Sequence, residues 1–105
     1  MIEFEVMHGK NGIVTDFSVS GHSGYAESGS DIVCAAVSSA VWMAVGGIER
    51  QNLADITYSQ DDGFVKCHIP EKRLEGADAL LKSLEYIMEE LEKQYSRYVK
   101  VICKD

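Results

Sequence analysis

The segment from Ile32 to Ile48 is apolar around almost its whole circumference when it is drawn as a helix. Such a helix has no polar face to turn toward water, so most of it has to be buried by the rest of the chain. Ser38, Ser39 and two glycines interrupt the segment, which we expect to be a buried helix and not a membrane span. A chain of 105 residues, 46% of them hydrophobic, has enough apolar material for one core around it. We therefore expect a single domain over residues 1–105.

Two periodicities divide the remaining chain into strands and helices. Alternating apolar and polar residues predict strands at 2–6, 13–19, 56–59, 64–69 and 98–103. Asn11-Gly12 and Asp61-Asp62-Gly63 mark hairpin turns. Helices are predicted from Asp31 to Arg50 and from about Leu74 to Tyr98, the second with apolar residues at helical spacing. The order β-β-α-β-β-α-β favours an α+β two-layer sandwich, an antiparallel or mixed sheet with one buried and one amphipathic helix. The patterns leave the strand order open.

Charge and cysteine usage narrow the function classes. The net charge of −7, from 17 acids and 10 bases, argues against binding of a nucleic acid backbone. An acidic surface either attracts a basic partner or serves solubility alone, and solubility is favoured here. We expect the acidic face from Glu85 to Glu92 simply to be solvated. Three widely spaced cysteines without a Cys-x-x-Cys pair suggest neither a disulfide framework nor a structural zinc site. The early acids in Met1–Val6 do not resemble a signal peptide, so a cytoplasmic location is expected.

The most chemically informative stretch runs from Gly21 to Ser38. It places His22 in a glycine-rich loop and Cys34 in the first turn of the helix that follows. Unpaired N–H groups and a partial positive charge at a helix start stabilise a thiolate, and a histidine within reach supplies a base. The glycines of this loop, Gly21, Gly24 and Gly29, allow a path back over the helix start and a loop that admits an extended substrate.

Other residues near this pair have two interpretations each. Asp31 either caps the helix or orients the His22 ring, and the cap is favoured. Ser38, one helical turn after Cys34, either bonds a backbone carbonyl or lines the site. The backbone N–H of Cys34 and those just before it are candidate oxyanion donors.

The remaining cysteines and histidines fit structural roles better. Cys67 and Cys103 lie in strand patterns and are assigned to packing. His8 lies in a hairpin turn and His68 on a strand, so neither is a strong base candidate. A metal site from His22, Asp31 and Cys34 matches no common ligand spacing, and no cofactor is implied.

The stretch Gly-His-x-Gly-Tyr-Ala-x-x-Gly-x-Asp-Ile-Val-Cys-Ala-Ala-Val-Ser, from Gly21 to Ser38, resembles the signature of the ribosomal-processing cysteine protease Prp family. The hairpin start, the long second helix and the length also fit, so the resemblance covers the whole chain. It implies a cysteine endopeptidase that removes a short N-terminal extension from the large-subunit ribosomal protein number twenty-seven. His22 and Cys34 match the catalytic pair, and the family is dimeric, which implies a homodimer with a basic precursor as substrate.

Two alternatives remain open at this point. One is a non-catalytic ribosome-associated binding module whose cysteine is merely buried. The other is an anion or phosphate binder that uses the loop and the helix start. The second lacks a P-loop lysine, and no lysine or arginine occurs between Lys10 and Arg50.

Overall fold

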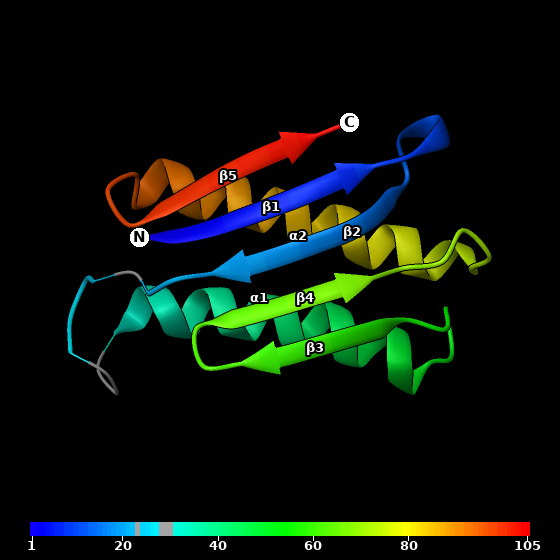
Figure 1. Cartoon of the computed structure of the whole chain (residues 1–105), viewed down its shortest axis with the longest axis horizontal. Coiled ribbons are helices and arrows are strands. Elements are labelled where there is room, and N and C mark those ends of the chain that lie inside the picture. The colour runs from blue at the N-terminus through cyan, green and yellow to red at the C-terminus, as the bar shows by residue number, and fades with distance from the viewer. Residues whose placement is uncertain (23, 28–30) are drawn as a thin grey trace.

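The computed structural model describes residues 1–22, 24–27 and 31–105 of the chain. A helix and a hairpin alternate twice, as the sequence predicted, and a final strand completes the sheet. The elements are β1 (Ile2–His8), β2 (Val14–Ser20), α1 (Ile32–Arg50), β3 (Thr57–Asp61), β4 (Phe64–His68), α2 (Glu75–Gln94) and β5 (Val99–Lys104). Figure 1 shows the sheet in front of the two helices.

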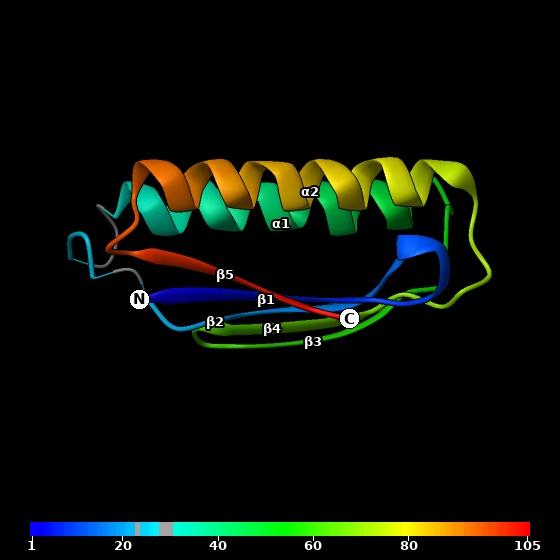
Figure 2. The same ribbon diagram turned by 90° about the horizontal axis from the view of Figure 1, so that it is seen from above.

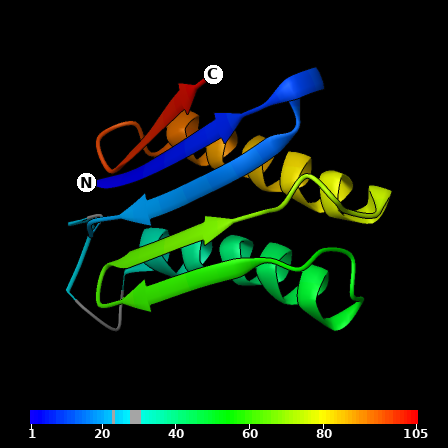
Figure 3. The same ribbon diagram turned by 45° about the vertical axis from the view of Figure 1, so that its right-hand side comes forward.

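The five strands form one mixed sheet in the order β3-β4-β2-β1-β5. Every neighbouring pair is antiparallel except β1 and β5, which run parallel. The register places Phe17 opposite Val6 on one side and Cys67 on the other, so apolar residues line up across one face. Both helices cover that face (Figure 2), with α2 behind β1 and β2 and α1 behind β4 and β3 (Figures 1 and 3). The predicted α+β two-layer sandwich is confirmed.

The long apolar helix α1 is less buried than its sequence predicted. Its inner side supplies core residues: Val33, Val37, Ala40, Val41, Ala44, Val45 and Ile48. Its outer side leaves Ile32 54% and Met43 64% exposed, because no third layer covers the helices. By length and composition alone α1 could cross a membrane, but its inner side belongs to the same core as the sheet and α2.

Helix α2 is the predicted amphipathic helix, but it ends earlier than the periodicity indicated. It stops at Gln94, and Tyr95 leaves the helical region with φ −129° and ψ 51°. The carbonyl of Tyr95 then accepts the N–H groups of Tyr98 and Val99, at 2.8 and 3.0 Å. This turn reverses the chain into β5. In the sequence Tyr95 and Tyr98 continue the helical spacing of apolar residues, but in the structure they belong to the turn.

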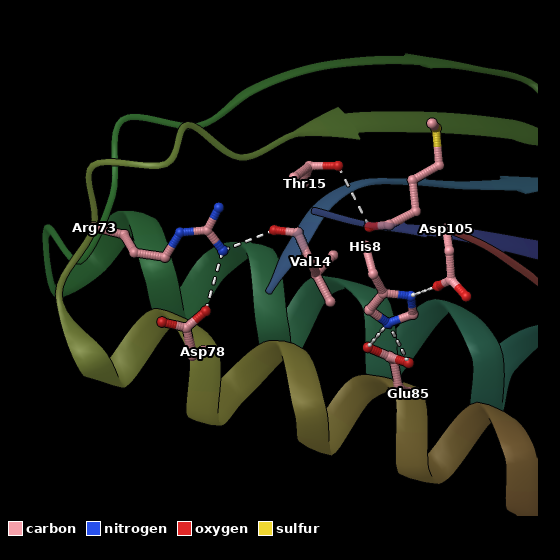
Figure 4. Close-up of polar contacts among 8 residues, drawn as sticks. His8, Val14, Thr15, Arg73, Asp78, Glu85 and Asp105 are labelled. Atoms are coloured by element: carbon pink, nitrogen blue, oxygen red, sulfur yellow. Dashed lines mark hydrogen bonds and ion pairs between the residues drawn. The ribbon is translucent and has the colours of Figure 1, made fainter. Parts of the chain in front are cut away.

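A buried arginine anchors the end of the sheet that holds the β1–β2 turn. The side chain of Arg73 is 4% exposed and bonds the Asp78 carboxylate at 3.1 Å. It also donates to the carbonyls of Val14, Pro70 and Ile69 at 2.7 to 3.1 Å, and Figure 4 shows the bonds to Val14 and Asp78. The guanidinium therefore joins three parts of the chain, which are β2, α2 and the segment that follows β4.

A half-buried histidine makes a second link between the layers. Nε2 of His8 lies 2.9 and 3.1 Å from the two carboxylate oxygens of Glu85, and Nδ1 lies 3.5 Å from Asp105 (Figure 4). A further acid of α2, Glu92, accepts the backbone N–H of Val101 at 2.8 Å. Two acids of the face that the sequence predicted to be solvated therefore hold α2 on the sheet.

Candidate active site

The loop that carries His22 and the start of α1 meet at one end of the sheet. Figures 1 and 3 place this end opposite the β1–β2 turn, with the β3–β4 turn and the start of β1 beside it. The topology explains the meeting, because β2 and β4 are antiparallel neighbours with Ser20 opposite Phe64. The residue after β2 is therefore brought next to the residue before β4.

Cys34 lies in the first turn of α1, as predicted, with a free and half-buried thiol. Asp31 is the N-cap, and its Oδ1 accepts the backbone N–H groups of Val33 at 2.9 Å and Cys34 at 3.0 Å. The favoured capping role of Asp31 is confirmed. The Cys34 N–H is thus not a free oxyanion donor in this structure, which corrects that expectation. The same carboxylate fills the place that an external anion would need.

His22 is fixed to the sheet through its backbone. The N–H of Gly21 donates to the carbonyl of Gly63 at 2.9 Å, and the carbonyl of His22 accepts the amino group of Met1 at 2.5 Å. A Cβ atom added to Gly21 would collide with the Met1 carbonyl oxygen, so only glycine allows this close approach. The described structure contains no hydrogen bond between the His22 ring and the Cys34 thiol.

His22, Cys34 and Ser38 together line two adjoining depressions. The first, of about 190 Å³, is mainly apolar and lies between α1 and strands β3 and β4. Its walls include Val37, Val41, Trp42, Phe64 and Val65. The second, of about 680 Å³, lies on the loop side and includes Gly24, Ala26, Asp31, Ala35 and Asp62. A peptide that extended from one depression into the other would therefore pass these three shared residues.

The supporting residues from the sequence take definite places. Ser38 lines both depressions, which favours the second of its two interpretations. Gly21 and Gly24 have positive φ angles of 89° and 72°. Gly29 lies outside the described residues. Tyr25, in the same loop, packs edge-on against the rings of Tyr95 and Tyr98, with centroids 5.9 and 5.2 Å away.

The β3–β4 turn is the part of the site that sequence reasoning missed. Asp61-Asp62-Gly63 predicts only a hairpin turn, yet Asp61 and Gly63 line the first depression and Asp62 lines the second. A Cβ atom on Gly63 would lie 2.8 Å from Nε2 of His22. The signal in the sequence was Gly63 itself, but its neighbour could not be known without the strand order.

The other cysteines and histidines stand apart from this cleft. Cys67 is buried in the core, and burial raises the pKa of its thiol to about 12. Cys103 is exposed on β5, and partial desolvation together with nearby carboxylates raises its pKa as well. Nδ1 of His68 bonds Asp16 at 2.9 Å on the open face of the sheet. His8 pairs with Glu85.

A thiol in the first turn of a helix and an imidazole on the same cleft form the arrangement that cysteine hydrolases use. Comparison with known proteins agrees. Residues 1–100 match the family model described as "Cysteine protease Prp". The chain belongs to this family and is a cysteine protease.

Relatives and solved structures cover essentially the full length. The ribosomal processing cysteine protease Prp of Staphylococcus aureus (strain Mu50 / ATCC 700699) is 26% identical, over 99% of this chain and 100% of its own. That of Bacillus subtilis (strain 168) is 27% identical over 96% of each. A crystal structure of the S. aureus protease with a covalently linked product peptide has a TM-score of 0.93, at 24% identity over 99% of this chain and 100% of that chain. A second, with a substrate peptide, has a TM-score of 0.87 at the same identity and coverage.

Proposed function

We propose that this chain removes the N-terminal extension of the large-subunit ribosomal protein number twenty-seven, with Cys34 as nucleophile and His22 as general acid and base. The observation that carries the proposal is the cleft in which these two side chains and Ser38 line both depressions. The relatives are ribosomal processing proteases, which supports a ribosomal protein as the class of substrate. Membership in a protease family favours the enzyme over the non-catalytic binding module.

The reaction begins with transfer of the thiol proton from Cys34 to the His22 ring. The sulfur then attacks the scissile carbonyl carbon, and its electron pair forms the new C–S bond while the carbonyl oxygen becomes an oxyanion. When the tetrahedral intermediate collapses, the C–N bond breaks and His22 gives its proton to the leaving amine. Water, deprotonated by His22, attacks the thioester, and release of the acid returns the proton to the thiol.

The oxyanion needs a donor other than the Cys34 amide as long as Asp31 caps the helix. The Ser38 hydroxyl is placed for this role, because it is on the same side of α1 one turn after Cys34 and lines both depressions. No hydrogen bond of the Ser38 hydroxyl is present in the described structure. We assign Ser38 to the developing oxyanion.

The two depressions differ in the substrate chemistry that they suit. The first suits an apolar side chain, since Val37, Val41, Trp42 and Phe64 line it. The second has the carboxylates of Asp31 and Asp62 at its edge. A ribosomal protein is basic, and a chain with a net charge of −7 attracts such a partner over long range.

Cleavage of one peptide tests the proposal directly. The peptide spans the extension and the first mature residues of the ribosomal protein, and mass spectrometry of the products locates the cut. We expect the wild-type chain to cleave it once and the variants Cys34→Ala and His22→Ala to leave it intact. Cys103→Ser and His68→Gln, which alter groups away from the cleft, serve as matched controls and are expected to cleave normally. Equal cleavage by Cys34→Ala would refute the proposal.

We further propose a cytoplasmic homodimer, on the strength of the family resemblance. Light scattering of the purified chain is expected to give twice the mass of one chain. A single-chain mass at the concentration used for the peptide assay would contradict the dimer without affecting the assignment of the catalytic pair.

A further inference from the structure

The ring of His22 lies directly against Gly63, a residue from another hairpin. A Cβ atom built on Gly63 would lie 2.8 Å from Nε2, 3.3 Å from Cε1 and 3.4 Å from Cδ2 of this ring. The three atoms form the outer end of the imidazole, so this end of the ring points at the Gly63 Cα. An alanine at 63 could keep its backbone only if the ring moved.

The backbone of the two segments is joined at the same place. The Gly63 carbonyl accepts the N–H of Gly21 at 2.9 Å, and Gly21 is the residue directly before His22. Residue 63 therefore fixes the main chain next to His22 and also limits where the ring can lie. Because the turn continues from the paired strands β3 and β4, both contacts are set by the sheet.

We propose that Gly63 is a positioning residue for the protease reaction, because its missing side chain leaves room for the His22 imidazole on the cleft that Cys34 also lines. The inference rests on the proposed role of His22 as the base. A shift of about 1 Å in a reacting group is enough to lower a rate on the order of 100-fold. The turn therefore acts on catalysis through the position of the His22 ring.

Gly12 offers a matched control for the backbone. Gly63 and Gly12 both have positive φ, 68° and 74°, so alanine is strained to a similar degree at either position. An added Cβ at Gly12 meets nothing within 4 Å, whereas at Gly63 it meets His22. We expect Gly63→Ala to lower kcat for peptide cleavage about 100-fold with KM changed less than about 2-fold. Gly12→Ala is expected to keep both constants near the wild-type values.

Alkylation of Cys34 separates positioning of the ring from general damage. In a Cys103→Ser background, the rate of reaction with iodoacetamide at pH 7 reports how well His22 removes the thiol proton. We expect Gly63→Ala to lower this rate to that of His22→Ala, and the double variant to be no slower than either. If the two losses multiply in the double variant, Gly63 does not act through His22 and the proposal fails.

Further outcomes distinguish a variant that fails to fold from a proposal that fails. If Gly63→Ala does not fold, Gly63→Asn replaces it, since asparagine adopts positive φ at less cost but still adds a Cβ. Gly63→Asn with wild-type kcat overturns the proposal. If His22→Ala is inactive while Gly63→Ala matches Gly12→Ala, only the positioning role is lost. If His22→Ala cleaves normally, the proposed function itself is wrong.

Discussion

The carboxylate of Asp31 accepts the backbone N–H of Cys34 at 3.0 Å, so a negative charge lies beside the main-chain nitrogen of the proposed nucleophile. The same oxygen accepts the N–H of Val33. A helix start usually stabilises a thiolate through such N–H groups, and here the cap has already used them. The arrangement caps the helix and places a carboxylate in the first turn, where Cys34 lies.

Asp31→Asn separates these two effects. Asparagine is an equally good N-cap, so we expect the free energy of unfolding to stay within about 0.5 kcal/mol of wild type. Loss of the negative charge is expected to increase the rate of Cys34 alkylation at pH 7 in a Cys103→Ser background. Asp31→Ala loses the cap and is expected to cost about 1 kcal/mol in urea unfolding. A slower alkylation in Asp31→Asn would show that the carboxylate assists the thiol.

Ser38→Ala tests the proposed oxyanion donor. Loss of one such donor lowers kcat on the order of 100-fold, and we expect an effect of this size with little change in KM. Ser39→Ala, an exposed neighbour that lines neither depression, is the matched control. Steady-state kinetics with the peptide substrate measures both constants. A kcat for Ser38→Ala within about 2-fold of the control removes the hydroxyl from the mechanism.

Trp42 is expected to determine how well an apolar substrate side chain binds. Its ring lines the first depression and packs edge-on against Tyr58, with centroids 5.7 Å apart. We expect Trp42→Ala to raise KM about 10-fold, which is the loss of roughly 1.4 kcal/mol of apolar contact. Met43→Ala removes an exposed side chain of the next residue and is expected to leave KM unchanged. Equal KM values for Trp42→Ala and Met43→Ala would show that the substrate side chain does not bind in the first depression.

The stability of the chain is expected to depend on pH through His8. The hydrogen bond to Glu85 is the main cause that raises the pKa of His8 above 6.5, and burial opposes it. Because the folded-state pKa is raised, this stabilisation is complete below pH 6.5 and is lost as the pH rises through the raised value. Between pH 6 and pH 9 we expect the wild type to lose on the order of 1 kcal/mol relative to His8→Gln. Urea unfolding at both pH values measures the difference, and parallel curves for the two proteins would contradict it.

Thiol labelling is expected to distinguish the three cysteines. At pH 8 iodoacetamide should modify Cys34 and Cys103, whereas Cys67 is buried and has a pKa of about 12. Mass spectrometry of the digested protein identifies the modified residues. Addition of urea should make Cys67 reactive together with global unfolding. Modification of Cys67 in the native protein at the rate of Cys103 would show that the core opens locally.

The secondary structure elements and the proposed catalytic pair, Cys34 and His22, could be predicted from the sequence. The residues that surround this pair could be predicted only in part. Periodicity placed β1 and α2 because each buries one face, and the long apolar segment placed α1. The first-turn position of Cys34 followed from Asp31 as the cap. The contact of His22 with Gly63 depends on β2 pairing with β4, which no local pattern encodes. The hydrogen bond from Cys34 to Asp31 depends on which way one side chain turns, and both choices suit a helix start.

Arg73 bonds Val14 at the start of β2, whereas His22 of the cleft follows the end of the same strand, so the two lie at opposite ends of β2. Local opening costs least where few buried bonds have to break. The buried guanidinium therefore fastens the end of the sheet that lies away from the proposed catalytic residues. Amide hydrogens around Val14 and Ile69 are expected to exchange only with global unfolding, whereas those of Gly21 and Asp62 exchange by small local openings. A protease built in this way can rearrange around a peptide while the rest of the sheet stays folded.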